Sequence, residues 1–367
     1  MRNNEAMKTQ TYLERVERVQ STLTPRPEKF ADSIYPKEEV RRDLSMLAVY
    51  KHSAEFIRGE ERSDAKLLEK TFIDMAESDD WFSEDDRFGD DPDYEAISTI
   101  PTSEIDDVFN HIDMIGTISN EDTGHERMHF AIDLTYNTDP DKLQKKFSWK
   151  HMYGMKRTAP EGASEFGEIV TERAYDGSTY KRTRRLRDKF RYGLKIPGFA
   201  SAKYFEDTDR DYDPDHEKGR IRIMPRFVVG YSPEIADTLA QGKPTEEMAE
   251  KYGRQYYNER MFSYNVARTC AKWCALNECA EQAAALCHML DKLTPEQTKW
   301  MHPDELSLAK KQAEAMNKYF GGALARAQEN AKGDTDEQAA MRYAESDEVR
   351  NGIQLRTGLN YIDGVQY

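Results

Sequence analysis

Two segments near the middle of the chain alternate apolar and polar residues, and this alternation predicts a β-hairpin. The first is residues 108–118 (VFNHIDMIGTI) and the second is residues 128–136 (MHFAIDLTY), with the polar stretch SNEDTGHER between them. Successive side chains of a strand point to opposite faces. We therefore expect Phe130 and Ile132 on one face of the second strand, and Asp133, between small residues, on the other.

Apolar residues at helical spacing lie on both sides of this hairpin. Residues 10–76 predict amphipathic helices, one of them over 64–76, and residues 244–330 return to the same period. After the hairpin, Pro140 at a first helical position predicts a helix. The segments PGFASAKYFED and RIMPRFVVGYS predict two strands, and PEIADTLAQG predicts a helix. This order indicates a compact α/β unit between helical regions.

Composition divides the chain further. DMAESDDWFSEDDRFGDDPDYE has Arg87 as its only base and is typical of a solvated linker. The last residues are polar and predict a mobile tail or an arm over another subunit. We expect five regions: an N-terminal helical region (1–76), an acidic linker (77–99), an α/β core (100–240, with helix 64–76), a C-terminal helical region (244–330) and a polar tail (331–367).

The charge balance restricts the possible functions. A formal net charge of −15 argues against a protein that coats nucleic acid non-specifically, although a local basic groove stays possible. No window approaches the 18 consecutive apolar residues of a membrane helix, and the start, MRNNEAMKTQTYLERVERVQ, lacks the apolar core of a signal peptide. We therefore expect a cytoplasmic protein that does not enter a membrane.

One basic stretch contrasts with the acidic chain. Residues 181–191, KRTRRLRDKFR, contain seven Lys or Arg and would follow a phosphate backbone if they lie on a helix or loop edge beside the core. A solvated helix face, or a patch that docks onto the acidic linker, is the alternative. The candidate nucleic-acid-binding residues are Lys181, Arg182, Arg184, Arg185, Arg187, Lys189 and Arg191.

All four cysteines lie close together in the C-terminal helical region. Cys270, Cys274, Cys279 and Cys287, with His288, invite a metal hypothesis, but their spacings match neither zinc nor iron–sulfur motifs. Their confinement to one helix also fits reduced thiols better than a disulfide framework. We interpret them as small apolar residues of a core.

Two aspartates interrupt the apolar strands of the hairpin. A hairpin symmetric about Thr123 and Gly124 places Asp113 opposite Asp133, unless the register slips by two residues. Like charges directly opposed on two strands are destabilising, so a buried pair needs a shared proton, a Lys or Arg partner, or a cation. Carboxylate oxygens suit Mg²⁺ or Mn²⁺. Aspartates that face solvent, or that pair with a helix Lys or Arg, are the alternative.

The order of elements and the two acids resemble the PD-(D/E)XK nuclease superfamily. The resemblance implies an α/β (α+β) fold with a restriction-endonuclease-like αβββαβ core, flanked by the N- and C-terminal helical regions. It implies that Asp113 and Asp133 hold Mg²⁺ or Mn²⁺ for phosphodiester hydrolysis, and that Glu69 is a possible additional acid. His111 shares the strand face of Asp113 and is a possible further member of the site.

The sequence departs from the family motif at one position. The resemblance places a catalytic lysine at residue 135, where this chain has Thr135. The following helix offers Lys142, Lys145 or Lys146 instead, to orient the attacking water and stabilise the transition state. Three hypotheses follow: a divergent metal-dependent nuclease, a catalytically inactive nuclease fold that binds nucleic acid or serves assembly, and an interaction protein that acts through its helical flanks. DNA or RNA preference and oligomeric state stay open.

Overall fold

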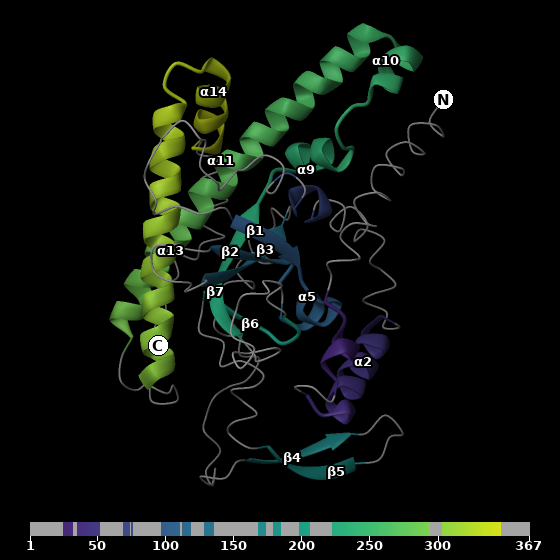
Figure 1. Ribbon diagram of the computed structural model, residues 1–367, viewed down its shortest axis with the longest axis vertical. Helices are drawn as coiled ribbons and strands as arrows, with labels where there is room; N and C mark the ends of the chain where they lie inside the picture. Colours follow the sequence, from purple (N-terminus) through teal and green to yellow (C-terminus); the bar gives the residue numbers. More distant parts are fainter. Residues whose placement is uncertain are drawn as a thin grey trace.

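A computed structural model of the chain has a mixed α/β fold, in which helices pack around one five-stranded sheet (Figure 1). This confirms the predicted α/β class. Of the described helices, none combines the length and the apolarity needed to cross a membrane. The structure describes residues 25–31, 35–51, 69–73, 75, 97–110, 112–118, 128–135, 168–173, 179–184, 198–205, 222–293 and 303–345.

The sheet combines an antiparallel meander with one parallel pair. Its order is β1-β2-β3-β7-β6. β1, β2 and β3 pair antiparallel, β7 runs parallel to β3, and β6 runs antiparallel to β7. The strands are β1 (Ile97–Pro101), β2 (Met114–Ile118), β3 (Met128–Thr135), β6 (Phe199–Ala202) and β7 (Arg222–Gly230).

The predicted hairpin forms in the symmetric register. Met114 pairs with Ile132 and Gly116 with Phe130, and the Asp113 N–H donates to the Ile132 carbonyl at 2.9 Å. A side chain at Gly116 would collide with the Phe130 ring, because an added Cβ would lie 2.2 Å from it. The symmetric register is therefore confirmed over β2, without the two-residue slip, and Asp113 directly precedes the paired residues.

The first strand of the hairpin is shorter than predicted. Residues 108–110 belong to helix α5 (Glu104–Asn110), so the strand prediction from residue 108 is wrong. The helix begins with a local cap, because the Asp106 N–H donates to the Ser103 hydroxyl oxygen at 3.2 Å. The cap favours a helix over residues 104–110, although residues 108–110 also fit the apolar alternation of a strand. The edge strand β1 was not predicted and includes the last residues of the expected acidic linker.

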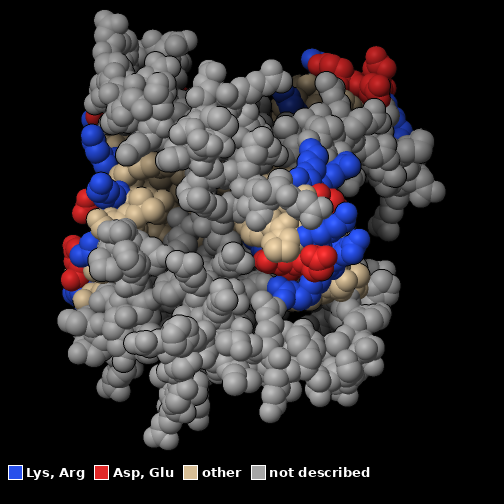
Figure 2. Space-filling model, turned by 60° about the horizontal axis from the view of Figure 1, so that its bottom comes forward, with Lys and Arg blue, Asp and Glu red and all other residues tan. Residues whose placement is uncertain are grey.

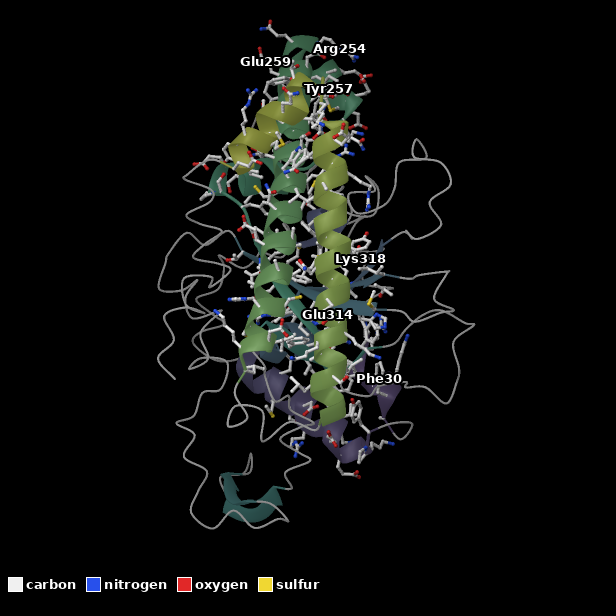
Figure 3. All side chains as sticks on the ribbon, turned by 90° about the vertical axis from the view of Figure 1, so that its left-hand side faces the viewer. Phe30, Arg254, Tyr257, Glu259, Glu314 and Lys318 are labelled. Atoms are coloured by element: carbon white, nitrogen blue, oxygen red, sulfur yellow. The ribbon has the colours of Figure 1, made fainter. Side chains whose placement is uncertain are left out.

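Helices α11 and α13 lie side by side along one face of the sheet (Figures 1 and 3). Phe320 of α13 contacts Phe130 of β3 and Phe227 of β7, with ring centroids 5.3 and 5.1 Å apart. The helical elements are η1 (Pro27–Phe30), α2 (Lys37–Lys51), α5, α9 (Pro233–Ala240), α10 (Glu246–Tyr252), α11 (Arg254–Lys292), α13 (Pro303–Asn330) and α14 (Thr335–Ala344).

Polar side chains of α11 complete the second half of β7. On the side of β7 that pairs with β6, the Arg226 N–H donates to the Gly198 carbonyl at 2.7 Å. Beyond Arg226, side chains of α11 contact this edge of β7. The Gln282 amide exchanges two hydrogen bonds with the Val228 backbone, each at 2.8 Å, and Glu278 accepts the Gly230 N–H at 2.8 Å. Residues four apart on a helix share one face, so this pair takes the place of a neighbouring strand.

The predicted polar tail begins with a helix. α14 is capped by Asp334, whose carboxylate accepts the Asp336 N–H at 2.9 Å, and Ala340 and Ala344 are buried. The indole N–H of Trp273 in α11 donates to Glu337 at 2.5 Å. The prediction of a mobile tail is therefore wrong for residues 331–345. It relied on the scarcity of large aliphatic residues, whereas small alanines form the packed face of this helix.

The cysteines fill the core, as predicted. Cys270, Cys274 and Cys279 of α11 are buried in the cluster that joins the sheet to the helices, and Cys287 is half-buried. Burial raises the pKa of the Cys270 thiol to about 11 and also raises that of Cys279 well above its ordinary value. These thiols therefore stay protonated and unreactive at neutral pH.

A separate two-stranded sheet contains part of the basic stretch. β4 (Glu168–Arg173) and β5 (Thr179–Arg184) form an antiparallel hairpin, which lies apart from the five-stranded sheet in Figures 1 and 3. Lys181, Arg182 and Arg184 are thus strand residues, and do not lie on the helix or loop edge considered for them. Thr179, Tyr180 and Thr183 are residue types that favour a strand, a signal that the count of charges obscured.

Candidate carboxylate site on the sheet

Asp133 lies on the face of the sheet opposite α11 and α13. Phe130 and Ile132 of β3 belong to the core cluster under those helices, whereas Ala131 belongs to a second cluster on the other face. Because side chains alternate along a strand, Asp133 points to the same side as Ala131, as the sequence predicted. The residue is only 3% exposed, so its carboxylate needs a partner.

The structure supplies a positive partner from the neighbouring strand. Nη1 of Arg226 lies 3.9 Å from Oδ2 of Asp133, and the two side chains are 6% and 5% exposed. Arg226 is opposite Ala131 in the parallel β3–β7 pair, whereas Asp133 is opposite Val228. Of the alternatives open at the sequence level, an arginine partner is therefore realised, but it comes from a strand rather than from a helix.

Asp113 is fastened to β3 through its backbone and its side chain. It lies at the bend before β2, and its Oδ2 accepts the Leu134 N–H at 2.6 Å. A carboxylate that accepts a backbone N–H is held in one orientation by a charge-assisted hydrogen bond. Asp113 therefore leaves the strand register, but its carboxylate is held beside the end of β3, the strand that carries Asp133. We call Asp113, Asp133 and Arg226 the carboxylate site.

The two carboxylates fit a divalent cation in number and type. Mg²⁺ is commonly bound through one or two carboxylates and completes its octahedron with water and substrate phosphates. Each carboxylate can accept several contacts, so the Leu134 N–H does not exhaust Asp113. Among the described residues, no group of three or more His, Cys, Asp or Glu is arranged to hold a metal. Glu69, in the helical residues 69–73, thus does not complete a three-ligand group with this pair.

Thr135, at the position where the resemblance places a lysine, is the last residue of β3. It is buried, and its carbonyl accepts the Tyr231 N–H at 3.0 Å. The remaining predicted site residues lie outside the described residues and stay predictions. They are His111, Lys142, Lys145, Lys146, Arg185, Arg187, Lys189 and Arg191.

A buried histidine shares the sheet with the carboxylate site and was not predicted. His129 of β3 is opposite Thr117 of β2, and its Nδ1 lies 2.9 Å from the Thr117 hydroxyl. Its ring meets Phe205 edge to face at 4.8 Å. The alternation that placed Asp133 on this face also places His129 there, so the pattern carried a signal for it.

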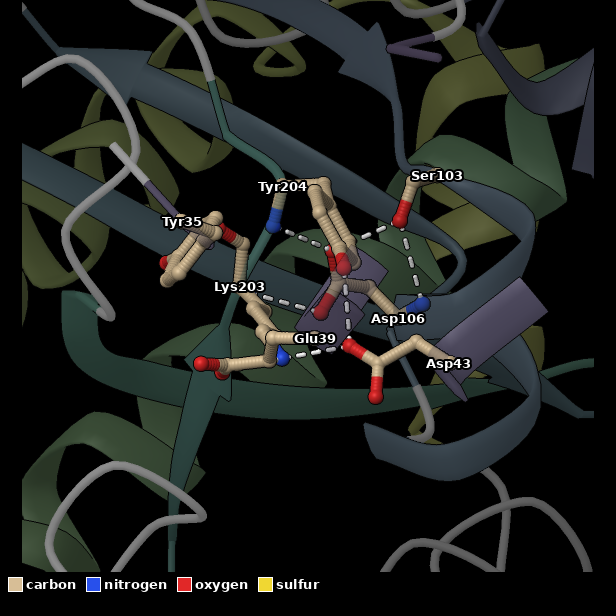
Figure 4. Close-up of polar contacts among 7 residues, drawn as sticks. All are labelled: Tyr35, Glu39, Asp43, Ser103, Asp106, Lys203 and Tyr204. Atoms are coloured by element: carbon tan, nitrogen blue, oxygen red, sulfur yellow. Dashed lines mark hydrogen bonds and ion pairs between the residues drawn. The ribbon is translucent and has the colours of Figure 1, made fainter. Parts of the chain in front are cut away.

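A second buried polar cluster ties together α2, α5 and the end of β6 (Figure 4). We call it the lysine cluster, because Lys203 is at its centre with Nζ 2.8 Å from Glu39 and in contact with Asp43. The Tyr204 hydroxyl donates to Asp43 at 2.7 Å. Its members are Tyr35, Glu39, Asp43, Ser103, Asp106, Lys203 and Tyr204.

Asp106 accepts hydrogen bonds from backbone N–H groups of this cluster. Its two oxygens accept the N–H groups of Lys203 and Tyr204 at 2.7 and 2.9 Å, and the Ser103 hydroxyl donates to it at 2.7 Å. The stretch SEID has the Ser-x-x-Asp spacing of a helix capping motif, which could have located Ser103 and Asp106. The partners of Lys203 are some 160 residues away in sequence, beyond any local pattern.

Aromatic rings surround the charge of Lys203 in the lysine cluster. The Lys203 ammonium lies 5.0 and 5.4 Å from the ring centroids of Tyr35 and Tyr204, within cation–π range. Burial and the hydrogen bond to Asp43 raise the pKa of Tyr204 well above its ordinary value, so the phenol stays protonated and donates. We interpret this cluster as a structural clamp between distant segments rather than as a reactive site.

The described surface mixes charges of both signs. In Figure 2, the Lys and Arg side chains of the described part are interspersed with Asp and Glu. The described residues on this face therefore present mixed charge, in contrast to the basic stretch predicted at 181–191.

Comparison with family models, curated proteins and solved structures gave no match for this chain.

Proposed function

We propose that this protein is a divergent, metal-dependent nuclease that hydrolyses phosphodiester bonds of nucleic acid at the carboxylate site. The observation that carries the proposal is the placement of two acids at one end of the β2–β3 pair: Asp133 is buried on β3, and Asp113, half-buried at the bend before β2, accepts the Leu134 N–H. Burying the Asp133 carboxylate is costly to a fold even beside an arginine. A second carboxylate at the same end of the strand pair favours a chemical role over a structural one.

The topology supports the same proposal. A helical segment at 69–73, the antiparallel meander β1-β2-β3 and the parallel strand β7 follow the order that the nuclease resemblance implies. The helix predicted from Pro140, between β3 and β7, lies outside the described residues. The restriction-endonuclease-like core is thus part of the proposal.

In this proposal Asp113 and Asp133 would hold Mg²⁺ or Mn²⁺. When bound, such an ion supplies an activated water and neutralises charge on the scissile phosphate. The Leu134 N–H fixes the orientation of the Asp113 carboxylate before any ligand arrives, which lowers the cost of organising the site. Asp133 is oriented by its strand and by Arg226.

A non-catalytic nucleic-acid-binding or assembly module is the second candidate. The Arg226–Asp133 ion pair favours it, because an arginine already balances the carboxylate that a metal would use. The absence of the motif lysine at Thr135 points the same way.

Cleavage assays on the full chain separate the two candidates. We expect labelled DNA or RNA to be cut in Mg²⁺ or Mn²⁺, and Asp133→Asn or Asp113→Asn to lower the rate by roughly two orders of magnitude or more, since each removes a charged ligand. Asp237→Asn, at an exposed position of α9, should cleave like the wild type. Salt-sensitive binding without cleavage would replace the nuclease proposal by the second candidate.

A further inference from the structure

The side of α13 that faces away from the sheet carries a row of exposed residues. Successive members are separated alternately by four and three positions, and residues at such spacings lie on one face of a helix. Each of the first five precedes a buried residue by two positions, so the row lies opposite the packed face. α13 is at the front of Figure 3, where Glu314 and Lys318 are labelled. We call this row the α13 stripe, and its members are Ser307, Lys311, Glu314, Lys318, Gly321 and Ala325.

Gly321 is not required by packing among the described residues. It lies inside a long helix, its φ is not positive, and a Cβ added to it would meet no atom within 4 Å. A glycine inside a helix destabilises it relative to alanine, and glycine is often used where another element approaches closely. The choice of residue at this exposed position therefore favours a neighbour that lies against the outer face of α13.

The α13 stripe is complementary to itself. Its spacing is symmetric about residue 316, so a second copy of the helix laid antiparallel places every stripe position opposite another stripe position. Glu314 is then opposite Lys318 of the second copy, and Lys318 is opposite its Glu314. Lys311 is opposite Gly321, which leaves room for the lysine stem. Each contact occurs twice, as in an interface with a two-fold axis.

Leu308 provides an apolar contact at each end of this pairing. Its side chain is 54% exposed although it is large and apolar. In the antiparallel pair it lies beside Ala325 of the second copy, and covering the two residues removes apolar surface from water. An apolar helix of another protein would cover Glu314 and Lys318 without pairing them, which is costly. A second copy pairs both charges and is therefore the better occupant.

We propose that α13 is a dimerisation helix, through which two copies of this chain pair antiparallel along the α13 stripe. Reciprocal Glu314–Lys318 ion pairs lie at the centre of the interface, and Leu308–Ala325 contacts lie at its ends. The dimer does not depend on the proposed function, since the stripe contains no residue of the carboxylate site. It assigns a two-fold symmetric assembly to a chain whose sequence left the oligomeric state open.

Charge exchange at the centre of the stripe tests the pairing. Sedimentation velocity of the full chain over a series of concentrations gives the dissociation constant of the dimer. We expect Glu314→Lys, and separately Lys318→Glu, to raise this constant at least roughly tenfold, because each opposes like charges twice. The variant with both substitutions restores opposite charges and should return to within about threefold of the wild type.

Gly321→Gln distinguishes a dimer interface from an exposed helix face. In the monomer the new side chain meets no described atom, and its higher helix propensity should raise the melting temperature. In the dimer it collides with Lys311 of the second copy, so the dissociation constant should rise at least roughly tenfold. Glu250→Lys, at an exposed position of α10, is the control and should leave the dissociation constant unchanged.

The outcomes leave the dimer supported or overturned. A wild type that is monomeric at every concentration is incompatible with it, and a dimer that Glu314→Lys does not weaken must form through another surface. If both single variants weaken the dimer but the exchanged variant does not recover, the antiparallel register is wrong. Because all these positions are exposed, unchanged circular dichroism spectra should show that the variants fold.

Discussion

The lysine cluster and the carboxylate site both bury a cation beside carboxylates, but they hold it differently. Lys203 contacts Glu39 and Asp43 directly, and aromatic rings and hydroxyl groups surround the charges. Arg226 approaches Asp133 only to 3.9 Å. Close contacts that satisfy every charge suit a permanent link between distant segments. The printed Arg226–Asp133 contact is longer, so the two clusters differ in geometry although they share residue types.

Removing the lysine of the tighter cluster should have the largest effect on stability. Lys203→Met leaves two carboxylates buried without their cation, and we expect a loss of about 3–5 kcal/mol in the free energy of unfolding, measured by denaturant titration. Lys310→Met is the matched control, because Lys310 pairs with Asp291 at 3.3 Å on the surface and should cost less than about 1 kcal/mol. Equal losses in the two variants would contradict the interpretation of the lysine cluster as a clamp.

Double-mutant cycles compare the two pairs directly. Combining Lys203→Met with Glu39→Gln should give a coupling energy of about 2–3 kcal/mol, and combining Arg226→Gln with Asp133→Asn should give about 1 kcal/mol or less in metal-free protein. The difference follows from contact distances of 2.8 and 3.9 Å. A coupling of Arg226 with Asp133 that equals the Lys203 value would show that contact distance does not decide the strength of these two pairs.

The pH dependence of the lysine cluster should give a smaller effect. Because the pKa of Tyr204 is raised in the folded protein, the unfolded chain loses this proton first, from about pH 10. Its stabilisation is therefore complete below pH 10 and declines as the pH rises above it. Between pH 8 and 11 we expect Tyr204→Phe to lose about 1 kcal/mol less stability than the wild type, by denaturant titration at each pH. Parallel declines would show that Tyr204 does not titrate in this way.

Local patterns in the sequence predicted the hairpin well. Its alternation and its symmetric loop were enough to predict the register of β2 against β3, because register follows from the side-chain period and the turn. The buried faces of α11 and the packing of its cysteines also follow from composition and period. These features depend on residues that are close in sequence.

Features that depend on distant residues were not predicted. Arg226 lies more than ninety positions from Asp133, and Lys203 some 160 from Asp43, so no spacing rule connects them. The edge strand β1 is too short and too polar for its pattern to stand out beside the acidic run. α14 packs through alanines, which carry a weak apolar signal. In each case the partner, rather than the segment itself, decides the structure.

The Gln282 and Glu278 contacts to β7 have a consequence for association between molecules. A strand edge with unpaired backbone groups is a template on which another chain can add a strand and aggregate. Here α11 occupies the hydrogen-bonding groups of Val228 and Gly230 with its own side chains, so the sheet cannot be extended at that position. A further strand could pair with this part of β7 only if α11 first left the sheet.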